Sequence, residues 1–135
     1  MAHDNVEIVR SSYEIIARQD ISRLLEIWDP QIEWREAEGH PYSDGNPYIG
    51  PDRILDGVFS RLGGEWEDFT AHPEEFLAQG DTVVVIGRYT GTYKSTGRPL
   101  DAQVVHVYRL RDGKVISFQQ FSDTAQFARV MSPDL

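Results

Sequence analysis

The sequence of 135 residues contains no cysteine, so neither disulfides nor thiolate metal sites can form, and we expect a cytoplasmic protein. No apolar run approaches the length of a membrane span, and the first residues do not resemble a signal peptide, so we expect no membrane association. Basic residues number 13 against 22 acidic ones, for a net charge of -9. Phosphate binding depends on clustered Lys and Arg, so this balance argues against a nucleic-acid partner.

Several catalytic signatures are also missing. The sequence has no nucleotide-binding loop and no nucleophile elbow. Its four histidines lie far apart, so we expect no metal site, and nothing indicates another cofactor. The length suits one ordinary domain over residues 1–135, large enough to bury a core without staples.

Apolar residues recur at helical spacing only in the first half of the chain and near its end. One helix is predicted around Val9 and Tyr13, and a second follows Asp20, a suitable N-cap. A third begins at Pro51, and Asp123 caps a last helical turn.

Alternation of apolar and polar residues marks the strands. Ile32, Trp34 and Glu36 share one face of an early strand, before an irregular loop or short hairpin over residues 38–51. Four longer strands are expected at residues 65–77, 82–93, 100–110 and 115–122. Helices segregated from antiparallel strands predict an α+β fold, with three helices of the N-terminal half covering a curved sheet.

Asp112-Gly113 predicts a two-residue hairpin between the last two strands. Counting outward from the turn places Val107 opposite Phe118 and Val105 opposite Gln120, all on the cavity side. The same count places Val104, His106 and Tyr108 on the outer face, where we expect them to form a homodimer interface.

The element order and several motifs resemble the nuclear transport factor 2-like superfamily, in particular its SnoaL-like and ketosteroid-isomerase-like branch. The motifs are residues 28–34 entering the first strand, residues 48–51 before the third helix, residues 105–115 around the hairpin, and Asp123-Thr124. The resemblance covers nearly the whole chain. It implies a cone-like, mostly antiparallel sheet, also called a cystatin-like roll, that encloses a pocket.

The resemblance also implies roles for individual residues. Ketosteroid isomerases use an Asp as base at the position of Glu36, and a first-helix Tyr, here Tyr13, to hydrogen-bond the enolate oxygen. Trp34 would form an apolar wall beside Glu36, and this wall would raise the pKa of the Glu36 carboxyl toward the range of a general base. We therefore predict Glu36 and Tyr13 as catalytic residues.

Other positions depart from the family pattern. Val105 stands at the position where the isomerases carry a protonated Asp, and that Asp completes their oxyanion site. Gln120 stands where cyclases and epoxide hydrolases carry a catalytic Asp, and an amide does not exchange protons at ordinary pH. Epoxide hydrolases need charged groups on the preceding strand, where this chain offers Gly87 and Tyr89, or Arg88 and Thr90 if the register slips by one residue. His40, in its Gly-Pro loop, is expected to close the pocket mouth or to serve as an auxiliary acid.

Two function classes follow. The first is a cofactor-free enzyme that moves a proton on a small apolar metabolite, as an isomerase, cyclase or lyase of carbonyl, polyketide or steroid-like compounds. The second is a non-catalytic domain that binds such a molecule. Outside these two classes, a purely structural dimer with a filled cone is a further alternative. The predicted substrate-binding residues are Trp34, His40, Tyr89, Gln103, Val105, Phe118 and Gln120.

Overall fold

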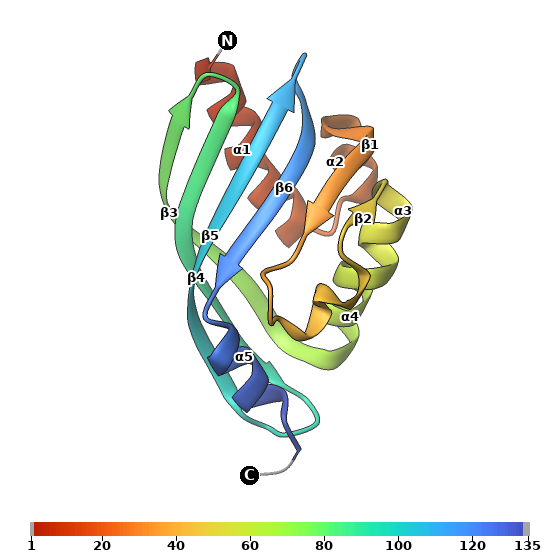
Figure 1. Ribbon diagram of the computed structural model, residues 1–135, viewed down its shortest axis with the longest axis vertical. Coiled ribbons are helices and arrows are strands. Elements are labelled where there is room, and N and C mark those ends of the chain that lie inside the picture. Colours follow the sequence, from red (N-terminus) through yellow and green to blue (C-terminus); the bar gives the residue numbers. More distant parts are fainter. Residues whose placement is uncertain (1, 134–135) are drawn as a thin grey trace.

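The computed structural model describes residues 2–133, which form a strongly curved sheet with helices packed against it (Figure 1). The helical elements are α1 (Ala2–Ala17), α2 (Ile21–Ile27), η1 (Pro41–Gly45), α3 (Pro51–Ile54), η2 (Leu55–Phe59), α4 (Ser60–Glu65) and α5 (Thr124–Met131). The strands are β1 (Trp28–Arg35), β2 (Tyr48–Ile49), β3 (Trp66–Gln79), β4 (Thr82–Tyr93), β5 (Pro99–Arg111) and β6 (Lys114–Ser122). Because α3, η2 and α4 are contiguous, they together form the third helix predicted from the sequence.

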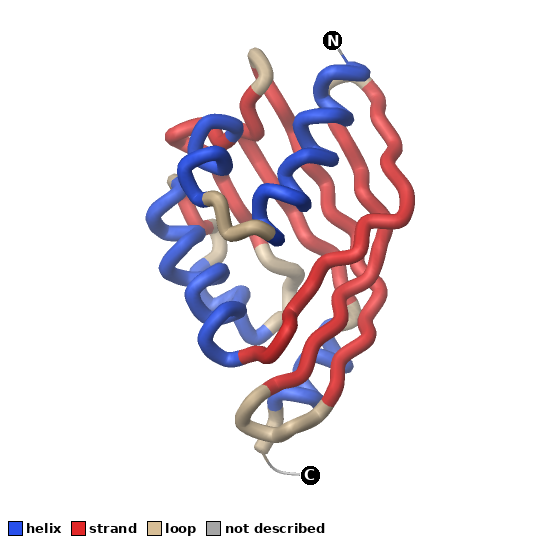
Figure 2. The backbone as a smooth tube through the Cα atoms, turned by 180° about the vertical axis from the view of Figure 1, so that it is seen from behind, coloured by secondary structure: helices blue, strands red, loops and turns tan. Residues whose placement is uncertain are grey.

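The six strands are ordered β2-β1-β6-β5-β4-β3. β1 runs parallel to β6, and the other neighbouring strands are antiparallel. The sheet does not close, since β2 and β3 lie at its two edges. From behind, α1, α2 and the third helix lie across one face of the sheet (Figure 2). The predicted α+β class is confirmed.

The starts of three helices follow the local signals in the sequence. The Asp20 side chain accepts a hydrogen bond from the backbone N–H of Arg23, and the Asp123 side chain accepts one from Gln126. Pro51 occupies the first turn of α3, where a missing N–H costs nothing. None of the helices formed by residues 2–133 is long and apolar enough to cross a membrane.

The last hairpin turns at Asp112-Gly113 as predicted, and both residues have positive φ angles, of 52° and 77°. Arg111 pairs with Lys114, but a β-bulge in β6 then shifts the register by one residue. As a result His106 pairs with Gln120, where the uninterrupted count had placed Val105. The predicted register is therefore wrong beyond the bulge.

Relative to the prediction, this shift exchanges the inner and outer faces of β5. Val104, His106 and Tyr108 are buried inside the molecule, so the homodimer interface predicted from them is wrong. Val105 lies on the outer face, paired with Phe121, whose side chain is 55% exposed. A one-residue slip reverses every side chain of a strand, so a single bulge accounts for the whole error.

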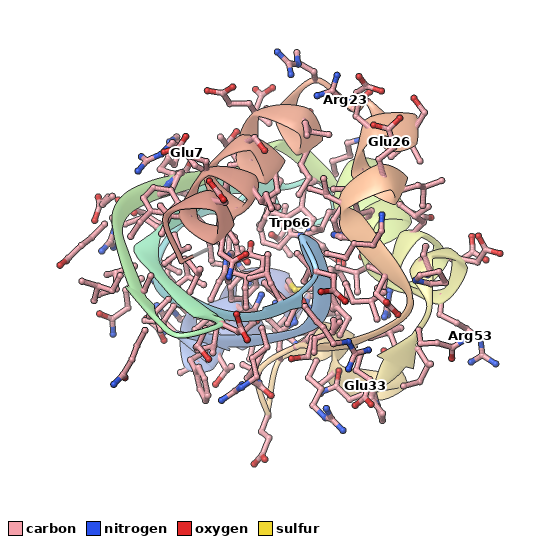
Figure 3. The ribbon with its side chains drawn as sticks, turned by 90° about the horizontal axis from the view of Figure 1, so that it is seen from above. Glu7, Arg23, Glu26, Glu33, Arg53 and Trp66 are labelled. Carbon is pink, nitrogen blue, oxygen red and sulfur yellow. The ribbon has the colours of Figure 1, made fainter. Side chains whose placement is uncertain are left out.

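Two groups of buried side chains lie between the helices and the sheet. The larger group joins α1, α2 and the third helix to the strands and includes Val9, Ile54 and Phe118. The smaller one surrounds Trp66 and Phe127. Viewed from above, Trp66 lies in the middle of the molecule, whereas the labelled charged residues point outward (Figure 3).

One close approach of strands depends on a glycine. Gly87 in β4 lies opposite Pro73 in β3, next to an irregularity in the pairing of the two strands. A Cβ at this position would lie 2.3 Å from the carbonyl oxygen of His72, so only glycine allows this approach. Pro73 is tolerated because β3 is an edge strand.

Candidate active site

A cavity of about 760 Å³ lies between the inner face of the sheet and the helices. Its walls are mostly apolar and aromatic. The Trp34 ring stacks on Phe118 with centroids 3.7 Å apart and planes 20° apart, and Phe59 packs edge-on against Trp34. Polar residues that line the cavity come from α1, from the segment after β1 and from the central strands, and they include Glu36, His40, Tyr13, Tyr89, His106, Tyr108 and Gln120.

Glu36 follows directly after β1, and strand alternation turns it inward with Ile32 and Trp34. Its residue exposure is only 3%. The Asn46 side chain holds its backbone, accepting from the Glu36 N–H at 3.0 Å and donating to the Glu36 carbonyl at 2.8 Å. The loop after β1 thereby fixes the direction in which the carboxyl points.

The Glu36 carboxyl is buried but not unpartnered. The Trp34 indole N–H donates to Oε2 at 2.9 Å, and the Gln120 amide donates to Oε1 at 3.4 Å. Burial raises the pKa of Glu36 to about 7, although both donors and, more weakly, Arg61 act to lower it. The carboxyl therefore changes protonation state near neutral pH, as a general base requires.

Gln120 has a fixed orientation. Its Oε1 accepts from the backbone N–H of Ala37 at 3.3 Å and from the Ser122 hydroxyl at 3.2 Å. Its amide nitrogen must therefore face Glu36 and the Tyr89 hydroxyl, to which it donates at 3.0 Å. Gln120 thus links the carboxyl to a second set of polar groups on the sheet.

That second set is a row of three phenols and one imidazole. The Tyr89 hydroxyl lies 2.5 Å from His106 Nε2, and the Tyr13 hydroxyl lies 2.7 Å from His106 Nδ1. The Tyr108 hydroxyl donates to that of Tyr13 at 2.9 Å. Burial lowers the pKa of His106 to about 3, so its imidazole is neutral. Burial raises the pKa of all three phenols, so they are protonated.

His40 occupies a different part of the wall, against Phe127 of α5. The residue is only 3% exposed, and its Nδ1 accepts from the backbone N–H of Tyr42 at 2.9 Å. Burial lowers its pKa to about 4, so the ring is neutral and its proton resides on Nε2. His40 is therefore a neutral hydrogen-bond donor and not an acid at ordinary pH.

The structure gathers most of the predicted site residues around the cavity. Tyr13, Trp34, Glu36, His40, Tyr89, Phe118 and Gln120 all line it. Gln103 and Val105 do not, because they lie on the outer face of β5. Within residues 2–133, no three His, Cys, Asp or Glu side chains come together as a metal site requires.

His106 and Tyr108 were assigned to the wrong face, although β5 itself carries a signal that places them inside. Its odd-numbered positions include Asp101, Gln103 and Arg109, whereas its even-numbered ones are apolar or aromatic apart from His106. That pattern indicates that the even positions face the core. The register counted from the turn contradicted the pattern, and the bulge resolves the conflict.

Residues 9–118 match the SnoaL-like domain family. No curated protein matches the chain. The crystal structure of an NTF2-like protein from Burkholderia thailandensis is 38% identical, with a TM-score of 0.89, covering 96% of this chain and 98% of that one. TerC, crystallised with polyporic acid, is 30% identical, with a TM-score of 0.78 and coverage of 94% and 97%. An NTF2-like protein from Burkholderia pseudomallei is 28% identical, with a TM-score of 0.86 and coverage of 96% and 98%.

Proposed function

This chain belongs to the SnoaL-like domain family, and we propose that it is a cofactor-independent enzyme that transfers a proton on a small, mostly apolar carbonyl compound. One observation carries the proposal: a carboxyl with a pKa of about 7 lies in the wall of an aromatic cavity that also contains neutral hydrogen-bond donors. The co-crystallisation of TerC with polyporic acid supports an organic molecule as the occupant.

In the proposed reaction the Glu36 carboxylate removes a proton from the carbon next to the carbonyl group. The C–H bond breaks, an O–H bond forms on Glu36, and the electron pair moves to the carbonyl oxygen. The resulting enolate oxygen accepts a hydrogen bond from Tyr13 or Tyr89. Each Glu36 oxygen accepts one N–H, from Trp34 or Gln120, and keeps another lone pair for the incoming proton.

The fate of the enolate sets the reaction type. Return of the proton to another carbon is isomerisation, attack on a second carbonyl is aldol-type cyclisation, and departure of a leaving group is elimination. All three begin with the same proton removal by Glu36. The first step can therefore be tested without knowing the natural substrate.

The test is hydrogen exchange at the carbon next to the carbonyl of small aryl ketones, followed by proton NMR in deuterated water. We expect Glu36→Gln to slow the exchange about 100-fold or more, because an amide cannot act as a base. Glu38→Gln, which removes an exposed carboxylate two residues away, is the matched control. If the wild-type protein exchanges no ketone faster than buffer does, or if Glu36→Gln is as fast as wild type, the proposal fails.

A non-catalytic binding domain is the second candidate. It is favoured by Gln120, an amide at the position where the resemblance places the acid of the cyclases. In that case Trp34→Ala weakens binding of an apolar ligand by removing the stacked wall of the cavity, whereas Glu36→Gln changes the affinity little. Calorimetric titration of both variants with one ligand separates the two functions.

We also propose that the protein forms a homodimer through the outer face of the sheet. Val105 and Phe121 are paired there, and Phe121 is more than half exposed. Phe121→Glu would place a charge in that contact and yield a monomer in analytical ultracentrifugation. A wild-type protein that is already monomeric would exclude the dimer.

A further inference from the structure

The four groups Tyr89, His106, Tyr13 and Tyr108 have more protons than there are hydrogen bonds between them. Three contacts join the four groups, between Tyr89 and His106, His106 and Tyr13, and Tyr13 and Tyr108. Each phenol contributes one proton, and a neutral imidazole contributes one more. Four protons serve three hydrogen bonds, so one proton of the row is left without an internal acceptor.

The neighbours of the row restrict where that proton lies. Tyr108 donates to Tyr13, so Tyr108 uses its own proton inside the row. Gln120 donates to Tyr89 and cannot accept from it, because its amide oxygen faces Ala37 and Ser122. The unused proton therefore belongs to Tyr89 or to Tyr13, and both side chains line the cavity.

The tautomer of His106 selects between the two. If the imidazole proton is on Nε2, His106 donates to Tyr89 and Tyr13 donates to Nδ1, which leaves the Tyr89 proton free. If it is on Nδ1, His106 donates to Tyr13 and Tyr89 donates to Nε2, which leaves the Tyr13 proton free. The two arrangements have the same heavy-atom positions.

We propose that His106 is a positioning residue whose tautomer determines whether Tyr89 or Tyr13 donates its hydroxyl proton to the bound molecule. The inference deepens the proposed function and rests on it for the identity of the ligand. It also narrows the ligand class. The row provides one hydroxyl proton at a time, and the Gln120 amide connects Tyr89 of the row to the Glu36 carboxyl. Because a single neutral donor lies near another acidic group, the site suits an uncharged carbonyl oxygen and disfavours a carboxylate.

The experiment uses NMR of the full-length protein with ¹⁵N-labelled histidine, with and without 1-indanone labelled with ¹³C at its carbonyl carbon. The nitrogen shifts identify the His106 tautomer, and the carbonyl shift reports a hydrogen bond to the ketone. The variants are Tyr13→Phe, Tyr89→Phe and the double variant. Tyr93→Phe, which removes a phenol outside the row, is the control.

With ketone bound, we expect Tyr13→Phe to hold His106 in the Nε2–H form, because only Tyr89 can then donate to the ligand. We expect Tyr89→Phe to hold it in the Nδ1–H form, because only Tyr13 remains. Each single variant keeps a hydrogen-bonded carbonyl shift. The double variant loses that shift and binds the ketone about tenfold more weakly, as expected for one neutral hydrogen bond.

Several outcomes would overturn the inference. These are the same tautomer in both single variants, an unchanged carbonyl shift in the double variant, or no saturable binding of the ketone to the wild-type protein. An imidazolium with protons on both nitrogens in the unliganded wild type at neutral pH would overturn it without any variant. Hydrogen exchange of the ketone, measured in the same samples, tests Glu36 separately. Opposite tautomers without exchange would refute only the base, and exchange with one shared tautomer would refute only the role of His106.

Discussion

Burial of Glu36 predicts an unusual dependence of stability on pH. Its pKa in the folded protein is about 7, against 4.5 for a Glu side chain in water. The folded state therefore holds this proton more tightly than the unfolded state does. Between these two pH values the native protein has more protons bound, so the free energy of unfolding falls as the pH rises. The stabilisation is fully present below pH 4.5 and is lost as the pH rises through about 7.

The magnitude follows from the shift. A difference of about 2.5 pKa units corresponds to about 3 kcal/mol. The group is buried, so solvent screening does not reduce this figure much. His40 and His106 act in the opposite direction: their lowered pKa values make the protein lose stability as the pH falls below the ordinary His range. A pH curve of the wild type alone would mix these contributions.

Glu36→Gln isolates the carboxyl, because the variant keeps both histidines. We expect the variant to gain about 3 kcal/mol relative to wild type between pH 4.5 and pH 8, in urea unfolding followed by circular dichroism. A ¹³C titration of the Glu36 carboxyl should give a midpoint near 7. A difference in stability that stays constant across this range, together with an ordinary carboxyl midpoint, would refute the reasoning.

Three further predictions concern the surroundings of the carboxyl and the register of the sheet. Trp34→Phe removes the N–H bound to Oε2, so the pKa of Glu36 should rise further in the same ¹³C titration, and a fall would contradict the assigned contact. Asn46→Ala removes both hydrogen bonds to the Glu36 backbone and should lower the free energy of unfolding, measured in urea, by about 1–3 kcal/mol. An unchanged free energy of unfolding would show that these hydrogen bonds do not fix the loop. Tyr108→Ala should lower the free energy of unfolding by about 3–5 kcal/mol, because Tyr108 is buried, whereas Val107→Thr on the opposite face should change it by about 0.5 kcal/mol or less. The reverse order of the two effects would support the register without the bulge.

Local signals determined much of the fold. The caps at Asp20 and Asp123, the helix start at Pro51 and the turn at Asp112-Gly113 each depend on a few neighbouring residues, and all four occur as predicted. The inward direction of Glu36 also follows from short-range alternation with Ile32. Such features are readable because their free energies come from contacts within a few positions along the chain.

The faces of β5 and β6 could not be obtained by counting from the turn. The bulge in β6 is marked by neither a glycine nor a proline, and it reverses the faces of β5 relative to Phe118 and Gln120, which line the cavity. His106 was therefore expected at a subunit interface, yet it lies in the middle of the polar row.

The sequence by itself determined the order of the main helices and strands, the starts of three helices and the carboxyl at residue 36, because these depend on short-range chemistry. The tertiary structure decided which partners surround that carboxyl and which residues join it. Trp34, Gln120 and Asn46 converge on Glu36 from β1, β6 and the loop after η1. Burial raises a pKa only when distant segments exclude water together, and that condition cannot be read from any one segment of the chain.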